Sequence, residues 1–519
     1  MKKKFIFIIL SLIIFLSAFL RLYHIGDYQT FLGDEGRDVL VAKGILEGDF
    51  TLLGPRSSAG DFFMGPAYYY MITPFLWLFR YDPVGPAVMV ALLSVATTWL
   101  IYFVGKRWFN PLTGLFASAL YAVSPLVINY SHSSWNPDVL PFFALLSLYF
   151  LFQAVQAKHP AKLFVFVGFL LGIAIQLHYL ALLLCFIAAV YTFASNWYLN
   201  HKPQIVIILI RYLQLFAGFV IGFAPFLLFE IRHGFPNTKS IMTFIFSDSA
   251  QKGYITGGTF FSTVGDAFFR IFGRLVFYFP SPEWYKLFQP MHLEFFRLFV
   301  ILVSLAAVIT LIIKTKNKLA LMLLGFWLFF GVFLLGFYKK NIYDYLFTFI
   351  FPLPFLIIGY FLSQFFVWGK KKPQKIIAGI VGAALFTGIF FYNLSGNPFQ
   401  YVPNRQKDQA KTISEFVLSQ TNGKPYNFAL ISGGNSDHAY RYFLETADRP
   451  PVTIENPMVD PERKTVTDQL LIVCEDTSCQ PLGHSLFEVA GYGRAEIVGE
   501  WNVSVVKVYK LVPYVEKEK

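Results

Sequence analysis

Long apolar stretches separated by short polar ones run through residues 1–392 of this chain. Because about twenty residues of helix cross a hydrocarbon core, stretches of this length predict transmembrane helices. The pattern predicts an α-helical polytopic membrane protein with about eleven transmembrane helices. The predicted spans are 5–22, 84–104, 112–128, 138–156, 163–178, 180–197, 205–229, 296–313, 319–337, 346–367 and 375–392.

The pattern changes after residue 392, where shorter apolar and polar alternations replace the long apolar runs. The helical spacing of apolar residues predicts an amphipathic helix over 407–420, and alternation predicts strands. The predicted strands are 426–432, 469–475, 495–501 and 503–512. We therefore expect two parts, a transmembrane domain over 1–392 and a small soluble α/β domain over 393–519.

Basic residues gather in every second loop between the predicted spans. Cytoplasmic loops of membrane proteins carry an excess of lysine and arginine, so these loops and the N-terminal lysines are predicted to be cytoplasmic. We expect a multi-pass protein of the cell membrane with an extracytoplasmic C-terminal domain, and we interpret the formal net charge of +12 as topology rather than nucleic-acid binding. The loop residues are Lys106, Arg107, Lys158, Lys162, Lys202, Lys314, Lys316, Lys318, Lys370, Lys371, Lys372 and Lys375.

Two further segments lie on the predicted outer side, a loop over 23–83 and a loop over 230–295. Loops this long are uncommon as simple connections and are usually functional. The cysteines of the soluble domain, Cys474 and Cys479, either form a local disulfide or share the short stretch by coincidence. Walker, Rossmann and nucleophile-elbow motifs are absent from the sequence.

Adjacent carboxylates open the first outer loop, in "FLGDEGRDVLVAKGILEGDF". Asp34 is predicted to be the N-cap of a short helix that lies on the membrane surface. In one interpretation Asp34 and Glu35 are solvated charges at a helix start. In the other, burial against an apolar wall disfavours the charged carboxylate and makes it a base near neutral pH.

Other polar residues of the predicted outer face have both a structural and a functional interpretation. Arg56 either binds a phosphate or is an exposed loop residue, and the tyrosines 68–70 are interpreted first as interfacial aromatics. Asp138 either caps a helix or belongs to a site at the membrane face. His178 is either structural or, with Glu35 and Asp138, a candidate ligand of a divalent cation.

The predicted outer loop "GFYKKNIYDYLF" contains a basic pair on the side where few basic residues are expected. Lys339 and Lys340 therefore either bind an anionic ligand near the outer leaflet or are solvated. Weaker candidates are Arg232, His233, Lys239, Arg270 and Arg274.

Together these features resemble the membrane glycosyltransferases of the GT-C type. The sequence is most similar to the glycosyltransferase family 39-like proteins, which include the protein O-mannosyltransferases and the aminoarabinose transferases that modify lipid A. The Asp-Glu pair after the first span, the later "GPRSSAGDFFMGPAYYY", the number of spans and the soluble tail carry the resemblance. The likeness is good over roughly the first 200 residues and only architectural afterwards.

The resemblance implies a sugar donor on a polyprenyl phosphate and a hydroxyl acceptor on a protein, a glycan or a lipid. It implies that Asp34 is the general base, that Glu35 supports it, and that one direct displacement inverts the anomeric carbon. Asp138 would be the acid of the second outer loop. The candidates for contacts to the donor phosphate or the substrate are Arg37, Arg56, Asp138, His178, Lys339 and Lys340.

The sequence departs from the aminoarabinose transferases where they carry Glu-Lys-Pro, because Met64-Gly65-Pro66 stands there. This argues against aminoarabinose as the sugar. The trefoil domain of the protein O-mannosyltransferases has no counterpart in 230–295. The alternatives are a ligase or polymerase of lipid-linked glycans and a transporter or flippase. A transporter would carry charges at mid-span, and the predicted spans are almost free of charge.

Overall fold

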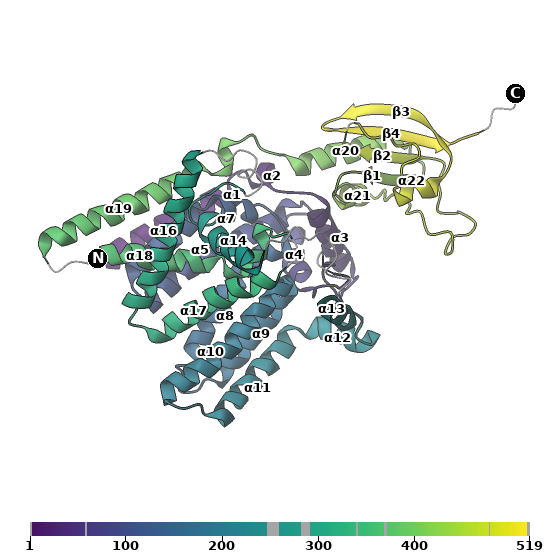
Figure 1. Cartoon of the computed structure of the whole chain (residues 1–519). Coiled ribbons are helices and arrows are strands. Elements are labelled where there is room, and N and C mark those ends of the chain that lie inside the picture. Colours follow the sequence, from purple (N-terminus) through teal and green to yellow (C-terminus); the bar gives the residue numbers. More distant parts are fainter. Residues whose placement is uncertain are drawn as a thin grey trace.

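The protein is described by a computed structural model over residues 3–57, 60–246, 259–281, 291–338, 341–367, 371–476 and 478–515. Figure 1 shows a bundle of long helices with a small domain, built around a sheet, at one end. The N-terminus and the start of α19 lie at the other end of the bundle (Figure 1). The predicted architecture, an α-helical polytopic membrane protein with a soluble C-terminal α/β part, is confirmed.

Each predicted span has a helical counterpart among the described residues. Eight helices are long and apolar enough to cross a membrane, or up to 10 if each of two bent pairs forms one span. The remaining predicted span corresponds to the shorter apolar helix α9, Ala161–Leu177. Five of the eight are α1 (Lys3–Leu22), α5 (Val84–Trp108), α11 (Ile205–Gly222), α16 (Met291–Lys314) and α19 (Lys372–Ser395). The other three are stretches that each contain one longer helix: Asn136–Ala154 contains α8, Tyr179–Asn200 contains α10, and Lys318–Phe337 contains α17.

The two bent pairs carry residues of the site described below. In the first, α6 (Pro111–Val123) meets α7 (Pro125–Ser131) at 62°, and in the second, η5 (Asp344–Ile350) meets α18 (Pro352–Phe365) at 63°. A proline opens the second helix of each pair, and proline is favoured at a helix start because it has no N–H to donate. The bends place α7 and η5 at the end of the bundle that carries the C-terminal domain.

The first long loop folds into α2 (Ile25–Tyr28), α3 (Gly33–Glu47) and α4 (Ala67–Leu78). Helix α3 was predicted to lie on the membrane surface, and the structure shows that protein covers it on two sides. Val39, Ala42 and Ile45 are buried, and α3 lies between α4 and a helix of the C-terminal domain. The sequence did not predict this protein cover, because the second covering element comes from a distant part of the chain.

Two local predictions in this loop need correction. Asp34 is not the N-cap, because α3 begins at Gly33 and Leu32 occupies the cap position. The interfacial interpretation fails for two of the three tyrosines, since Tyr68 and Tyr69 are buried in the core and Tyr70 is exposed. The Tyr68 hydroxyl is hydrogen-bonded to Ser134 Oγ at 2.9 Å, so its polar end has a partner inside the protein.

The described part of the second long loop contains α12 (Ala224–His233), α13 (Pro236–Phe246) and α14 (Phe260–Gly273). Glu230 is buried and accepts hydrogen bonds from Asn237 and Thr238. Asn237 Oδ1 accepts from the Phe63 backbone N–H at 2.8 Å, which ties the two long loops together. The weaker candidates Arg232, His233 and Lys239 are exposed and lie outside the cavities described below.

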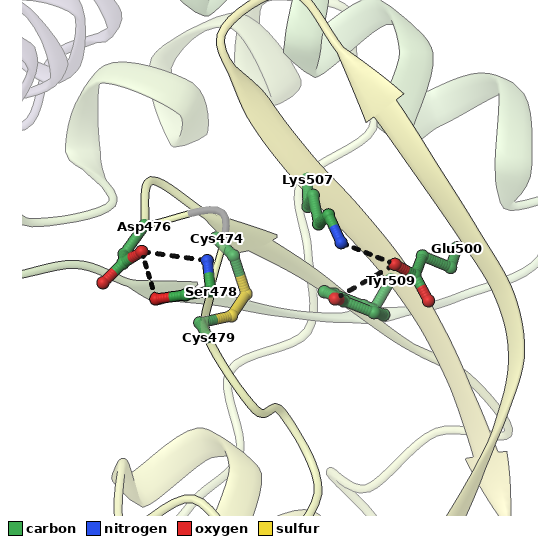
Figure 2. The surroundings of a disulfide bond; sticks show 7 residues. All are labelled: Cys474, Asp476, Ser478, Cys479, Glu500, Lys507 and Tyr509. Carbon is green, nitrogen blue, oxygen red and sulfur yellow. Dashed lines mark hydrogen bonds and ion pairs between the residues drawn. A yellow bond between two sulfur atoms is a disulfide. The ribbon is translucent and has the colours of Figure 1, made fainter.

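The C-terminal domain contains the helix and the four strands predicted from the sequence. The strand order is β1-β2-β4-β3, with β1 and β2 parallel and the other two pairs antiparallel. Cys474 at the end of β2 and Cys479 form a disulfide, beside a turn in which Asp476 accepts from Ser478 (Figure 2). The elements are η6 (Pro398–Gln400), α20 (Gln406–Gln420), β1 (Asn427–Ile431), α21 (His438–Thr446), β2 (Leu470–Cys474), α22 (Phe487–Tyr492), β3 (Ala495–Val503) and β4 (Val506–Pro513).

The C-terminal domain is docked on the first long loop through apolar and polar contacts. The ring of Phe31 packs edge-on against Tyr442 and Phe443 of α21. Lys407 pairs with Asp82 at 3.3 Å. Because these contacts join one continuous hydrophobic core, the soluble domain is a fixed wall of the region around α3.

Candidate functional site

Asp34, in the first turn of α3, lies between two cavities. The larger has a volume of about 780 Å³ and the smaller about 190 Å³. Asp34 and Trp135 line both. The Asp34 side chain is 54% exposed, so its carboxylate is open to a molecule in either cavity. Its place at the shared wall is the central geometric feature of the site.

The larger cavity combines residues from distant segments of the chain. Arg274 follows α14, Asp344 begins η5, and both line the cavity together with Asp34 and Glu35. Arg274 Nη2 pairs with Asp344 Oδ2 at 2.7 Å, and Arg270 Nη1 reaches Asp344 Oδ1 at 3.3 Å. The remaining lining residues are Thr30, Leu32, Gly33, Leu126, Asn129, Tyr130, Ser133, Trp135, Gly434, Asn435 and Ser436.

The smaller cavity brings together four residues predicted from the sequence. Asp34, Arg37, Arg56 and His178 all line it, and Tyr345 completes an aromatic part of its wall. Arg56 pairs with Asp61 at 2.6 Å, but the two side chains are 63% and 79% exposed. Such an exposed ion pair contributes little stability, so Arg56 is readily available to another anion.

Arg37 links Asp34 to a buried second carboxylate. Its Nη1 donates to Asp34 Oδ1 at 2.7 Å, and its Nε and Nη2 donate to Asp38 Oδ1 at 2.9 and 2.7 Å. Burial raises the pKa of Asp38 to about 7, although the Arg37 charge opposes this shift. Burial alone would lower the pKa of Arg37, but the nearby Asp38 and Asp34 carboxylates raise it overall. The guanidinium therefore stays charged and fixes the position of Asp34.

Glu35 is buried and holds the first turn of α3 in place. Its Oε2 accepts from the Leu32 backbone N–H at 3.0 Å, and its Oε1 accepts from Ser133 Oγ at 2.8 Å. Burial raises the pKa of Glu35, and the nearby Asp34 charge adds to the rise, while the hydrogen bonds oppose it. Glu35 thus connects the loop, the helix start and the segment after α7, while its neighbour Asp34 faces the cavities.

Asp138 and His178 lie close to the site but have different surroundings. Asp138 is buried, and within the described ranges neither of its carboxylate oxygens has a hydrogen-bond partner. Asn136 and Pro137 line the smaller cavity, whereas Asp138 is behind that wall. His178 Nδ1 accepts from the Leu180 N–H at 3.2 Å, and burial lowers the pKa of His178 to about 3, so the ring is neutral.

The metal candidates do not assemble into a binding group. Among the described residues no three His, Cys, Asp or Glu side chains are close enough together to hold an ion. The predicted set Glu35, Asp138 and His178 is therefore not gathered around one ion position in the described part of the chain. Lys339 and Lys340 lie outside the described residues.

Comparison with known proteins relates this arrangement to one family model and to several solved structures. Residues 64–228 match the family model of the dolichyl-phosphate-mannose-protein mannosyltransferases. The fold is similar to ArnT from Cupriavidus metallidurans, with a TM-score of 0.63, 12% identity and 98% of each chain covered. The family match covers about a third of the chain, and the fold over nearly its whole length is that of ArnT. No curated protein matches this chain in sequence.

Two other solved structures show the same fold more distantly. The Archaeoglobus fulgidus oligosaccharyltransferase has a TM-score of 0.54 and 13% identity, with 88% of the present chain and 65% of the archaeal chain covered. Arabinofuranosyltransferase AftD from Mycobacteria has a TM-score of 0.54 and 12% identity, with 99% of the present chain and 40% of AftD covered. The archaeal protein has also been solved in complex with Zn and sulfate.

The matched range of the present chain includes Asp138 and His178 but begins after Asp34 and Glu35. The evidence for the Asp-Glu pair is therefore the geometry around α3. Sequence reasoning ranked Arg274 among the weaker candidates and did not predict several residues of the larger cavity, Asp344 and Asn435 among them. The signal for Asn435 was the turn sequence "SGGNSD" directly after a predicted strand, which is typical of a loop that contacts another surface.

Proposed function

We propose that this protein is a glycosyltransferase that moves a sugar from a polyprenyl phosphate to a hydroxyl group of a protein, a glycan or a lipid, with Asp34 as general base. The observation that carries the proposal is the position of Asp34 at the wall shared by two cavities that charged side chains line. A base must reach the acceptor hydroxyl next to the anomeric carbon, which requires one carboxylate facing both substrates.

The donor phosphate is assigned to the smaller cavity. Its volume of about 190 Å³ suits a phosphate group, and Arg56 and Arg37 line it. The planar fork of arginine binds two phosphate oxygens at once. Because the Arg56 ion pair with Asp61 is exposed, a phosphate can replace that carboxylate at low cost. ArnT from Cupriavidus metallidurans has been solved bound to undecaprenyl phosphate, which supports a donor of this class.

The acceptor is assigned to the larger cavity of about 780 Å³, which Asp34, Asn129 and Ser436 help to line. Asp34 takes the proton of the acceptor hydroxyl, whose oxygen then bonds to the anomeric carbon. The bond from that carbon to the phosphate oxygen breaks, and the lipid phosphate leaves with both electrons. One such displacement inverts the anomeric centre.

The transferase works on the outer face of the cell membrane in this proposal. Basic residues occur near the ends of α5 and α16 and at the starts of α17 and α19. Asn317 at the start of α17 contacts the end of α5, through a hydrogen bond to the Trp108 carbonyl oxygen. The positive-inside rule assigns these ends to the cytoplasm, and the end with α3 and the C-terminal domain to the outside.

The test supplies the purified full-length protein with radiolabelled sugars, each offered on a polyprenyl phosphate and on a nucleoside diphosphate. We expect transfer from a lipid phosphate donor alone, with a product whose anomeric configuration is opposite to that of the donor. Transfer from the nucleotide sugar, or retention of configuration, would contradict the proposal. A lipid-linked glycan as the sole acceptor would favour the ligase or polymerase alternative.

A further inference from the structure

We infer that the C-terminal domain forms part of the transfer site, and that Asn435 is a positioning residue that holds Asp34 in place. This inference rests on the proposed function and deepens it, because it assigns a wall of the acceptor cavity and a support for the base. Gly434, Asn435 and Ser436, in the loop between β1 and α21, line the larger cavity together with Asp34.

Asn435 caps α3 from another domain. The first N–H groups of a helix have no partner within the helix and are usually satisfied by a side chain at the cap position. Here that position is Leu32, whose side chain has no acceptor. The Gly33 N–H instead donates to Asn435 Oδ1 at 2.8 Å. Since Asp34 is the next residue, this bond fixes the backbone from which the proposed base projects.

Asn435 is itself held at both ends of its side-chain amide. Its Oδ1 also accepts from the Ser436 N–H at 2.9 Å, and its Nδ2 donates to Glu475 Oε1 at 2.7 Å. Glu475 Oε1 accepts in addition from the Tyr440 hydroxyl at 3.0 Å. Glu475 lies between Cys474 and Cys479, in the short loop that the disulfide closes. The support therefore runs from the disulfide loop through Asn435 to the helix that carries Asp34.

The surface of α3 is shaped for this contact by two glycines. A Cβ on Gly33 would lie 2.1 Å from Ser436 Oγ, and a Cβ on Gly36 would lie 2.3 Å from the Ala439 backbone nitrogen. Any larger residue at Gly36 would force the backbone of α21 away from α3, because a contact with backbone has no flexible side chain to move aside. The α3 sequence "GDEG" thus places the domain against the helix within one turn of Asp34.

The experiment compares wild type with Asn435→Ala and with a control, Lys407→Ala, in the full-length protein. Lys407→Ala removes a different contact of the same domain, the ion pair with Asp82. We expect Asn435→Ala to lower kcat by about tenfold or more with the KM for both substrates nearly unchanged, because misplaced catalytic groups cost rate rather than binding. Lys407→Ala should leave kcat within about twofold of wild type, because neither partner of this ion pair belongs to α3, the helix that carries Asp34.

Hydrogen exchange supplies a readout that does not depend on activity. In Asn435→Ala, amides at the start of α3 should exchange faster, while those of β1 keep their wild-type rates. Unchanged exchange at Gly33, or an equal loss of kcat in Lys407→Ala, would overturn the inference. If the wild type transfers no sugar at all, the proposed function fails and the exchange measurement alone decides the role of Asn435.

A conservative variant separates positioning from general damage. Asn435→Asp keeps an acceptor for the Gly33 N–H, but places a second carboxylate against Glu475. Lowering the pH protonates one of the two and restores a donor between them. We expect the activity of Asn435→Asp relative to wild type to rise as the pH falls. A ratio that stays flat with pH would argue against the amide bridge to Glu475.

Discussion

The two ends of the helix bundle each contain a large cavity, and the two cavities differ in chemistry. The cavity at the α3 end, about 780 Å³, is lined by Asp34, Glu35, Arg274 and Asp344. The cavity at the other end, about 520 Å³, lies between α16, α18 and α19, where Lys314 is the one charged residue among the described lining residues. Two large cavities are therefore lined by very different residues, and cavity size alone does not identify the site.

The charged residues of the α3 end are held by hydrogen bonds and ion pairs that cross the chain. Burying a carboxylate is costly unless it is paired or hydrogen-bonded, so Glu35 and Asp38 occupy positions that packing alone does not favour. Among the residues that the structure describes between 291 and 395, no comparable group lines the cavity at the other end. The difference indicates that the α3 end is organised for chemistry, while the apolar cavity is compatible with contact to membrane lipid.

Replacing Asp34 should have the largest effect on sugar transfer, because Asp34 is the residue that most clearly separates the α3 end of the bundle from the other end. Asp34→Asn keeps the size of the side chain and a hydrogen-bond acceptor for Arg37, but removes the proton acceptor. We expect sugar transfer to fall by about 10²- to 10⁴-fold, the range typical of a general base. The measurement is the initial rate of transfer at saturating donor, and a rate equal to that of wild type would remove Asp34 as the base.

Glu35→Gln should have the next largest effect on transfer. It changes a residue that supports Asp34 but leaves Asp34 unchanged. The amide can accept only one of the two hydrogen bonds that Glu35 accepts from Leu32 and Ser133. We expect transfer to fall about ten- to a hundredfold, with a loss of about 1–3 kcal/mol in the free energy of unfolding. The matched control is Glu47→Gln at the exposed end of the same helix, which should change neither.

Arg56→Ala sharpens the comparison from the donor side. If Arg56 binds the donor phosphate, its loss should raise the donor KM by about tenfold. Lys314→Ala also removes one positive charge, but in the cavity at the other end of the bundle. It should leave the donor KM within about twofold of wild type. A larger effect at Lys314 than at Arg56 would move the phosphate site to the opposite end of the bundle.

The smallest effect expected concerns the pH dependence of stability. The pKa of buried Asp38 is raised to about 7, above the value of about 4 for an unfolded chain. Its contribution to stability is therefore complete below about pH 4 and is lost as the pH rises through about 7. Thermal unfolding in detergent should show a flatter pH dependence for Asp38→Asn than for wild type. Identical slopes would contradict the raised pKa.

The sequence predicted the helices and the strands because their signals are local. The apolar runs of α5 and α16 and the alternation of β4 each lie within one continuous segment of the sequence. The protein cover of α3 was not predicted, because its covering helix, α21, lies about 400 residues away in the chain. The cap of α3 by Asn435 and the pair of Arg274 with Asp344 are likewise formed only by tertiary folding.

The site was predicted in part for the same reason. Asp34, Arg37, Arg56 and His178 come to one cavity as expected for a shared site, because each was predicted to lie on the same side of the membrane. The proposed metal set failed on geometry, since side chains on one face need not point toward one centre. Periodicity and charge predict the order of the helices along the chain and the side of the membrane on which each loop lies. They do not predict the distance between two side chains.

Chemical rescue tests the central claim, that Asp34 takes the proton of the acceptor, most directly. Asp34→Ala leaves space for a small carboxylate beside the larger cavity, so added formate can take over the role of the missing side chain. We expect formate to restore a measurable part of the transfer rate in Asp34→Ala and to do nothing for Glu35→Ala. Equal rescue of both variants, or transfer at the wild-type rate by Asp34→Ala without formate, would contradict the account.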